Sequence, residues 1–441
     1  MTIGRIIAFV VLAGGLSCCA DTQPVPEATI LEKAAELTVA EALKPADTAV
    51  SLKSYASALS QVSEKHPRLV SLAAQSQRAA GALGERASAF KPQVGLTGRA
   101  GQYDDGSGWT NGATVGLDIS QLIYDGGAAK AGMDAAQTAK IQADLTLVAT
   151  REEVLNSAGA AWIDVWFLEE RARRMKARLD EASPLINRIK KMAETGLADR
   201  TIIEKADKSV LDVRLEIQRL ESSRSEAAGR FSAYFGTTPK NLTAPKSLVS
   251  AAEAQSAADN WRESAQLKAS ASRVLSANFE LQLAEADLKP KIVANAGSTA
   301  PLSSDAPVKS LGLMVTYNFG DGGRRKSRIE SAKASVAAAE ADLELQMTQS
   351  EAAAFAANLS YADVTTGITL VKEQIAVLSQ SRETARSQIA SAQSNLNTLL
   401  ETEIDLYRAE DRLLALESEK LKLELRMLQI GGKLAHAAGR E

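Results

Sequence analysis

Side chains able to carry out chemistry are scarce in this sequence. The chain of 441 residues has two histidines, His66 and His436, which lie far apart. Its two cysteines, Cys18 and Cys19, both end an apolar N-terminal stretch. A catalytic triad needs a histidine close to a nucleophile, and a thiolate or imidazole metal site needs several such ligands together. The sequence therefore predicts a protein that is not an enzyme and that has no resident cofactor or metal.

Bulk composition narrows the class further. Lys and Arg number 51 against 54 Asp and Glu, a net charge of −3, which excludes nucleic-acid binding driven by bulk positive charge. Aromatic residues make up only 4% of the chain, a low share that suits long helices packed through alanine. Length alone suggests about three domains.

Residues 1–19 are predicted to be a signal peptide. Their apolar run of about eleven positions is too short to span a bilayer as a helix. A Leu-Ser pair before the cysteines resembles a bacterial lipobox, so Cys19, or alternatively Cys18, is a candidate for a covalently attached lipid. Ordinary signal cleavage without lipidation is the alternative. Residues 20–50 contain three prolines and are expected to form an extended tether.

The most informative feature is an internal repeat. Three landmarks recur in the same order: FKPQV at 90–94 as LKPKI at 288–292, VGLDI at 115–119 as LGLMV at 311–315, and TIIE at 201–204 as TLLE at 398–401. The intervals are 198, 196 and 197 residues, so the chain carries a duplication. We place the repeats at 51–235 and 259–431, separated by a connector at 236–258 and followed by a tail at 432–441.

Each repeat has the same order of predicted elements. A helix leads into a strand pair, at 91–123 or 290–319, and then into a long helical hairpin, at 125–235 or 322–431. Each first helix of a hairpin runs for roughly 70 residues, or about 100 Å. Dense alanine, with leucine and valine three and four residues apart, is the pattern of closely packed coiled coils.

Alternation in the strand pairs indicates one apolar and one polar face. Leu311, Leu313 and Val315, for example, alternate with glycine, methionine and threonine. Two different faces at a period of two residues are what a lipid-facing, water-lined barrel requires. Tyr124 and Tyr317 fall at strand ends, where an interfacial aromatic belt would lie. A pair of soluble hairpins packed on one face is the alternative.

Four strands cannot close a barrel, and open sheet edges are not viable in lipid. The chain must therefore share its strands with copies of itself, and three copies would supply twelve. The predicted fold class is mainly α with a small transmembrane β part. Duplicated long helical hairpins form a tunnel, and four strands per chain enter a trimeric twelve-stranded β-barrel.

The order of these features resembles one family. The duplicated plan, the Asp-Gly-Gly at 125–127 and 321–323, and the Gly-Leu pair that precedes Glu204 are similar to the TolC family of outer-membrane channel-tunnels. The resemblance covers about residues 50–430. It implies a homotrimer in the bacterial outer membrane, with its helical part in the periplasm. It also implies a periplasmic adaptor (membrane fusion) protein and an inner-membrane pump as partners.

The resemblance carries over three sets of residues. Hairpin tips that would contact the adaptor match Thr195, Gly196 and Leu197 in the first repeat and Ser394, Asn395 and Leu396 in the second. Acids that would form the pore gate match Glu401, then Glu403, Asp405, Glu204 and Asp207, with Thr398 at the other gate position of the family. The strand-to-helix junctions match Asp125, Gly126, Gly127, Asp321, Gly322 and Gly323. For the acids, a solvated helix start is the alternative, because acids are common there.

The sequence thus predicts a trimeric outer-membrane export duct of a tripartite pump. Its cargo is protein, in type I secretion, or alternatively drugs or metals, in efflux. We favour protein cargo because of the general character of the second helix of the second hairpin. Two other classes compete with a duct. A periplasmic adaptor should have one hairpin flanked by a β domain, and a structural coiled-coil lipoprotein would not need four amphipathic strands.

Overall fold

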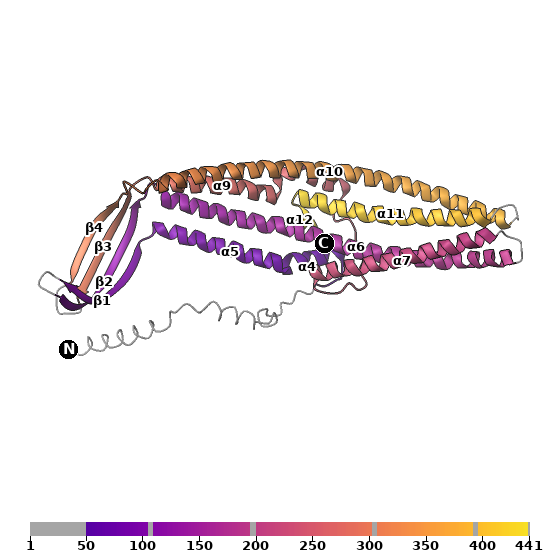
Figure 1. Cartoon of the computed structure of the whole chain (residues 1–441), viewed down its shortest axis with the longest axis horizontal. Coiled ribbons are helices and arrows are strands. Elements are labelled where there is room, and N and C mark those ends of the chain that lie inside the picture. The colour runs from indigo at the N-terminus through magenta and orange to yellow at the C-terminus, as the bar shows by residue number, and fades with distance from the viewer. Residues whose placement is uncertain (1–49, 105–108, 195–199, 302–306, 391–395, 440–441) are drawn as a thin grey trace. The chain divides into compact units, whose positions relative to one another are not determined.

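The computed structural model describes residues 50–104, 109–194, 200–301, 307–390 and 396–439 (Figure 1). The first repeat consists of α4 (Tyr55–Lys65), α5 (Pro67–Ala87), η1 (Ser88–Phe90), β1 (Gln93–Asp104), β2 (Trp109–Tyr124), α6 (Ala128–Glu194) and α7 (Arg200–Phe235). The second consists of α8 (Ala251–Asp259), η2 (Trp261–Glu263), α9 (Ala265–Ala286), β3 (Lys291–Pro301), β4 (Val308–Thr316), α10 (Arg324–Ala390), α11 (Leu396–Ile430) and α12 (Leu434–Ala438). A mainly helical chain with one small sheet and two long hairpins confirms the predicted fold class.

The two longest helices are equal in length. α6 and α10 each contain 67 residues, so each runs for about 100 Å. α6 continues through Pro184, although proline lacks the N–H that a helix interior uses. In the described part of the chain, no helix combines the length and the apolar character needed to cross a lipid bilayer.

The four strands form one antiparallel sheet in the order β1-β2-β3-β4. Leu96 lies opposite Leu117, Ile119 opposite Ala296, and Ala294 opposite Leu313. Directly opposed residues share a face, so the register gathers the alternating apolar side chains of all four strands on one side. That side is open in the single chain, where Leu311 is 88% exposed. β1 and β4 are the two edges of the sheet.

Three local features differ from the sequence-based elements. The single helix expected before the first strand pair is broken at His66, whose backbone is extended because Pro67 follows it. The region placed in the connector contains most of α8, which begins with a capping box between Ser250 and Glu253. The region placed in the tail contains the short helix α12, whose Leu434 is fully buried.

The main hydrophobic core surrounds Trp162 of α6, which is 0% exposed. Its indole contacts the rings of Tyr55, Phe231 and Phe235 at centroid distances between 5.6 and 5.8 Å. Its Nε1 donates a hydrogen bond to the Thr243 carbonyl oxygen at 3.1 Å, so the buried N–H is satisfied. This core therefore fixes α4, α6, α7 and the chain that follows α7 against one another.

Candidate pore gate and strand-to-helix junctions

The first strand-to-helix junction is a capped turn at Asp125. Oδ1 of this aspartate accepts a hydrogen bond from the Gly127 N–H at 3.0 Å, and Oδ2 accepts one from the Ala129 N–H at 2.6 Å. Gly126 and Gly127 have φ of 73° and 96°, which only glycine adopts without strain. The carboxylate thus satisfies N–H groups at the start of α6 that have no partner within the helix.

The second junction repeats this geometry at Asp321. Its Oδ1 accepts from the Gly323 N–H at 3.1 Å and its Oδ2 from the Arg325 N–H at 3.0 Å, with φ of 66° and 91° at Gly322 and Gly323. Here the Arg325 side chain adds an ion pair at 2.8 Å. The hydrogen bond from the Arg325 side chain is the largest of the interactions that hold the pKa of Asp321 below its usual range.

The five acids expected at the gate lie near the starts of α7 and α11. Glu401 Oε1 lies 3.8 Å from Lys205 Nζ of α7, and Asp207 Oδ1 lies 2.7 Å from Lys190 Nζ of α6. These contacts place first-repeat cations beside acids of both hairpins. Asp405 pairs within its own helix with Arg408 at 3.6 Å, and Glu204 is exposed.

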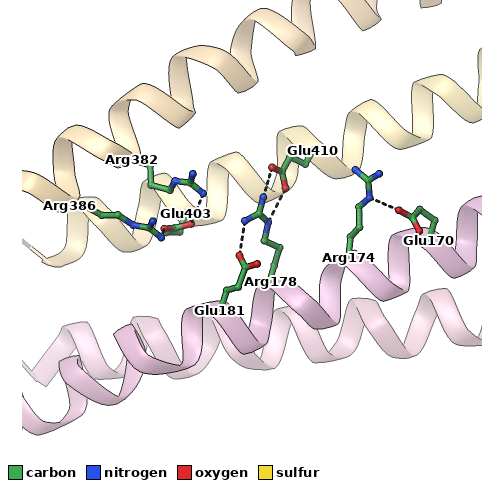
Figure 2. A network of polar contacts seen from close by, with 8 residues as sticks. All are labelled: Glu170, Arg174, Arg178, Glu181, Arg382, Arg386, Glu403 and Glu410. Carbon is green, nitrogen blue, oxygen red and sulfur yellow. Dashed lines mark hydrogen bonds and ion pairs between the residues drawn. The ribbon is translucent and has the colours of Figure 1, made fainter.

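Glu403 differs from the other gate candidates because it is largely covered. Its side chain is 19% exposed and accepts from Arg386 Nη2 at 2.7 Å, while Arg382 Nη1 lies 4.0 Å away (Figure 2). Both arginines belong to α10, so Glu403 joins the two helices of the second hairpin. The five acids therefore do not form one cluster of free carboxylates within a single chain.

Sequence reasoning missed a set of ion pairs between the two hairpins. Arg171 of α6 donates from Nε and Nη2 to the two carboxylate oxygens of Asp411 on α11, at 2.7 and 2.8 Å. Seven residues further along α6, Arg178 donates in the same way to Glu410, at 3.0 and 2.5 Å (Figure 2). Paired donors and acceptors fix both the distance and the orientation of the groups. The only sequence signal was an arginine-rich run on one helix and two adjacent acids on another.

A cavity of about 350 Å³ lies beside these ion pairs, between the hairpins. Its apolar lining comes from both repeats and includes Met175, Leu179, Pro184, Val213, Leu400 and Tyr407. Arg178, Arg386 and Glu403 also line it. Burial, followed by the charges of Asp411 and Glu216, raises the pKa of the Tyr407 phenol, so this group stays neutral. At this level the hairpins are thus joined both by the ion pairs and by an apolar cluster that includes Met175, Val213 and Tyr407.

Several predicted positions lie outside the described residues. These are the lipidation candidates Cys18 and Cys19, the tip residues Thr195, Gly196 and Leu197, and the tip residues Ser394 and Asn395. Leu396 is the first residue of α11. Among the residues that the structure describes, no group of three or more His, Cys, Asp or Glu side chains is arranged to hold a metal ion.

Comparison with known proteins gives the same family as the sequence. The model of the outer membrane efflux protein family matches residues 58–237 and 259–440, one match for each repeat. The outer membrane efflux protein BepC of Brucella suis is 22% identical over 378 residues, which are 80% of this chain and 78% of BepC. The outer membrane protein TolC of Vibrio cholerae is 25% identical over 178 residues, 40% of each chain.

Solved structures show the same fold. The outer-membrane channel OprN superposes with a TM-score of 0.73 at 18% identity, covering 90% of this chain and 96% of OprN. The match therefore includes both the strands and the long hairpins. The family model and the two relatives, all described as outer membrane proteins, confirm the predicted outer-membrane location, and the family is one of efflux channels. The chain belongs to the outer membrane efflux protein family.

Proposed function

We propose that three copies of this chain form an export duct through the outer membrane, as part of a tripartite pump. The four-stranded sheet carries this proposal, because it has one open apolar face and two edges, β1 and β4. Unpaired backbone groups at a sheet edge are too costly in lipid, so the edges must pair with those of other copies. Three copies supply twelve strands, an even number within the range of such barrels.

The long hairpins support a duct that continues beyond the sheet. Both α6 and α10 begin directly after a strand pair, so the helical part extends from the sheet by about 100 Å. α10 also leaves a row of apolar side chains open to solvent in the single chain, including Phe355, Leu359, Leu370 and Val377. In the proposed trimer a neighbouring copy covers this row.

The gate of the duct is proposed at Glu401. Its side chain is 60% exposed near the start of α11, whereas Glu403 is tied to α10. Three copies of Glu401 around an axis would repel one another, and Lys205 moderates that repulsion in each copy. We expect Glu401→Ala to raise pore conductance in planar bilayers, with Glu403→Ala acting mainly on hairpin stability. Unchanged conductance in Glu401→Ala would contradict the gate assignment.

The mass of the native particle tests the duct itself. The full chain is extracted from outer membranes in mild detergent and its native mass is measured. We expect three chains per particle. A monomer from the same fraction would leave the sheet edges unpaired and would overturn the proposal.

The proposed duct could carry either of two classes of cargo, small molecules or protein, and a gene deletion distinguishes them. The family description and the printed name of BepC speak of efflux, which favours small molecules. Protein cargo in type I secretion is the expectation from the sequence. Deleting the chain in its host should raise sensitivity to exported drugs or metals in the first case. In the second case it should abolish the release of a specific secreted protein without such sensitivity.

The proposed partners are a periplasmic adaptor and an inner-membrane pump. The adaptor would contact the hairpin tips, around Gly196 and around Asn395. Cysteines introduced at these two positions should cross-link to the adaptor in cells, whereas a cysteine at exposed Lys240 should not. Equal cross-linking at all three positions would contradict docking at the tips.

A further inference from the structure

A group of basic side chains lies where the sheet joins the helices. Lys91 precedes β1, and Arg324 and Lys326 lie in the first turn of α10. In an antiparallel sheet whose strands begin and end beside the helices, these positions share one level of the molecule (Figure 1). We call these three residues the basic collar.

Among the described residues the collar cations have no side-chain partners, unlike several neighbouring cations. All three side chains are exposed, and none makes a hydrogen bond or ion pair within the described part of the chain. In contrast, Arg325 binds Asp321, Arg328 binds Asp287 at 2.6 Å, and Lys130 binds Asp134 at 2.9 Å. The ion pairs of the junction therefore form without the collar residues.

Comparison of the two repeats shows that the junction forms without a cation at the first helical position. Ala128 occupies in the first repeat the place of Arg324 in the second, and Asp125 caps α6 with the same hydrogen bonds. A cation at a helix N-terminus also opposes the helix dipole, so Arg324 and Lys326 do not stabilise α10 electrostatically. The junction therefore does not require Arg324.

The surface beside the collar indicates what surrounds these cations in the membrane-inserted protein. Exposed aromatic rings lie at the same junction: Tyr124 ends β2, and Tyr317 and Phe319 lie between β4 and α10, with Phe319 93% exposed. The apolar face of the sheet, with Val315 and Leu313, continues from them. From β4 to Arg324 and Lys326, apolar surface, then aromatic rings, then cations is the order in which a membrane protein meets hydrocarbon, interface and headgroups.

The acids nearest the collar lie on its helical side. Glu85 precedes Lys91 by six residues, and Glu330 follows Lys326 by four, one helical turn, although these two side chains form no ion pair in the described part of the chain. Asp125, Asp287 and Asp321, which lie closer, are already bound by backbone N–H groups or arginines. Unpaired positive charge therefore faces the level of the lipid headgroups.

We propose that the basic collar binds the phosphate groups of anionic glycerophospholipids in the periplasmic leaflet of the outer membrane. Lys and Arg side chains near such a surface attract its phosphates, and the aromatic rings hold the adjacent acyl-chain boundary. The collar would fix the depth of the sheet in the membrane and bind lipid independently of the number of copies in the particle.

The test measures lipid binding by the full chain. Protein extracted in mild detergent and stripped of lipid is titrated with short-chain phosphatidylglycerol, and bound lipid per chain is counted by native mass spectrometry. We expect the variant Lys91→Ala/Arg324→Ala/Lys326→Ala to bind at least about tenfold more weakly than the unchanged chain. The control Lys208→Ala/Lys240→Ala/Lys372→Ala removes three exposed cations elsewhere and should bind like the unchanged chain.

A single substitution protects the test against misfolding of the triple variant. Arg324→Ala reproduces the first-repeat junction and should weaken binding by about two- to fivefold, while Arg324→Lys should restore it. Equal binding by the unchanged chain and the collar variants would overturn the proposal. Inorganic phosphate binding as tightly as the lipid would also overturn it, because the site would then recognise the free anion. Because lipid is counted per chain, these outcomes do not depend on the proposed trimer.

Discussion

The two long helices have the same length and equivalent places in the repeats, yet their surroundings differ. α6 packs against α5, α7, α9 and α11, whereas α10 packs mainly against α9 and α11. The interval of 196 residues between Asp125 and Asp321 pairs Ile163 of α6 with Leu359 of α10. Ile163 is 0% exposed and Leu359 is 55% exposed. Equivalent apolar positions are thus core in one repeat and surface in the other.

The exposed apolar side chains of α10 lie on one side of that helix. Phe355, Leu359, Leu370 and Val377 fall within an arc of about 60°, opposite the buried residues Ala357 and Tyr361. Exposed Thr366 and Glu373 fall in the same arc, and the exposed apolar side chains between them mark an interaction surface. α6 therefore completes its core within the chain, whereas α10 requires a neighbour.

The largest effect is expected from Trp162→Ala in the core around α6. Removing this indole leaves a cavity between three other aromatic rings and should lower the free energy of unfolding by about 3–5 kcal/mol. Phe355→Ala on α10 should change it little in the dissociated chain. Denaturant unfolding in mild detergent measures both. Similar losses for the two variants would contradict the assignment of one helix to the core and the other to the surface.

Charged substitutions in the apolar row of α10 should dissociate the trimer without unfolding the chain. We expect Phe355→Glu/Leu359→Glu to give a folded monomer, because a neighbouring copy cannot bury two carboxylates without partners. Native mass measures this effect and circular dichroism checks the helices. Lys372→Glu, exposed on the same helix but outside the row, should remain trimeric. A trimeric double variant would show that another surface joins the copies.

Much of this comparison follows from local sequence pattern. The period of two residues predicts the faces of the strands, and Asp-Gly-Gly predicts the capped junctions, because both depend on residues a few positions apart. The pairs Arg171–Asp411 and Arg178–Glu410 join residues 240 and 232 positions apart, and no local pattern gives the register between two helices. For the same reason sequence reasoning assigned Glu401 and Glu403 one role, although Glu403 is held by two arginines of α10.

Intermediate effects are expected at the contact between the hairpins. Arg171 and Asp411 are each about a fifth exposed and share two hydrogen bonds, so a double-mutant cycle with Arg171→Gln and Asp411→Asn should give a coupling of about 1.5–3 kcal/mol. The exposed pair Lys176–Glu221 within the first hairpin is the matched control and should give less than about 1 kcal/mol. Equal couplings would mean that ion pairs between hairpins contribute no more than those on the surface.

Smaller effects should distinguish the two junctions. Asp125→Ala removes a helix cap and should cost about 1 kcal/mol. Asp321→Ala should cost more, because it also leaves Arg325 without its carboxylate. Asparagine at either position retains a side-chain oxygen for the cap and serves as the control. Equal losses at both positions in thermal unfolding would show that the Arg325 pair contributes nothing.

The smallest effect concerns an ionisable side chain that is buried on α6 and has no counterpart at the equivalent position of α10. Glu152 is 3% exposed and accepts hydrogen bonds from the N–H groups of Leu434 and Ala435 at 2.7 and 3.0 Å, whereas the equivalent residue of α10 is exposed Thr348. Burial raises the pKa of Glu152, and the two N–H groups oppose this only in part. The folded state therefore holds its proton to higher pH than the unfolded state does. Stability from this group is full below the ordinary glutamate pKa and falls as pH rises through the raised value.

Glu152→Gln tests that sign, because glutamine keeps an oxygen acceptor for the start of α12 but cannot ionise. Unfolding of the unchanged chain and of the variant is compared from pH 4 to pH 8, so that all other titrating groups cancel in the difference. Relative to the variant, the unchanged chain should lose stability as pH rises. Exposed Glu153 lies next to it on α6, and Glu153→Gln should show no such trend. A difference that grows in the opposite direction would mean that the N–H groups of α12 outweigh burial and that α6 holds a stabilised carboxylate at its crossing with the C-terminal segment.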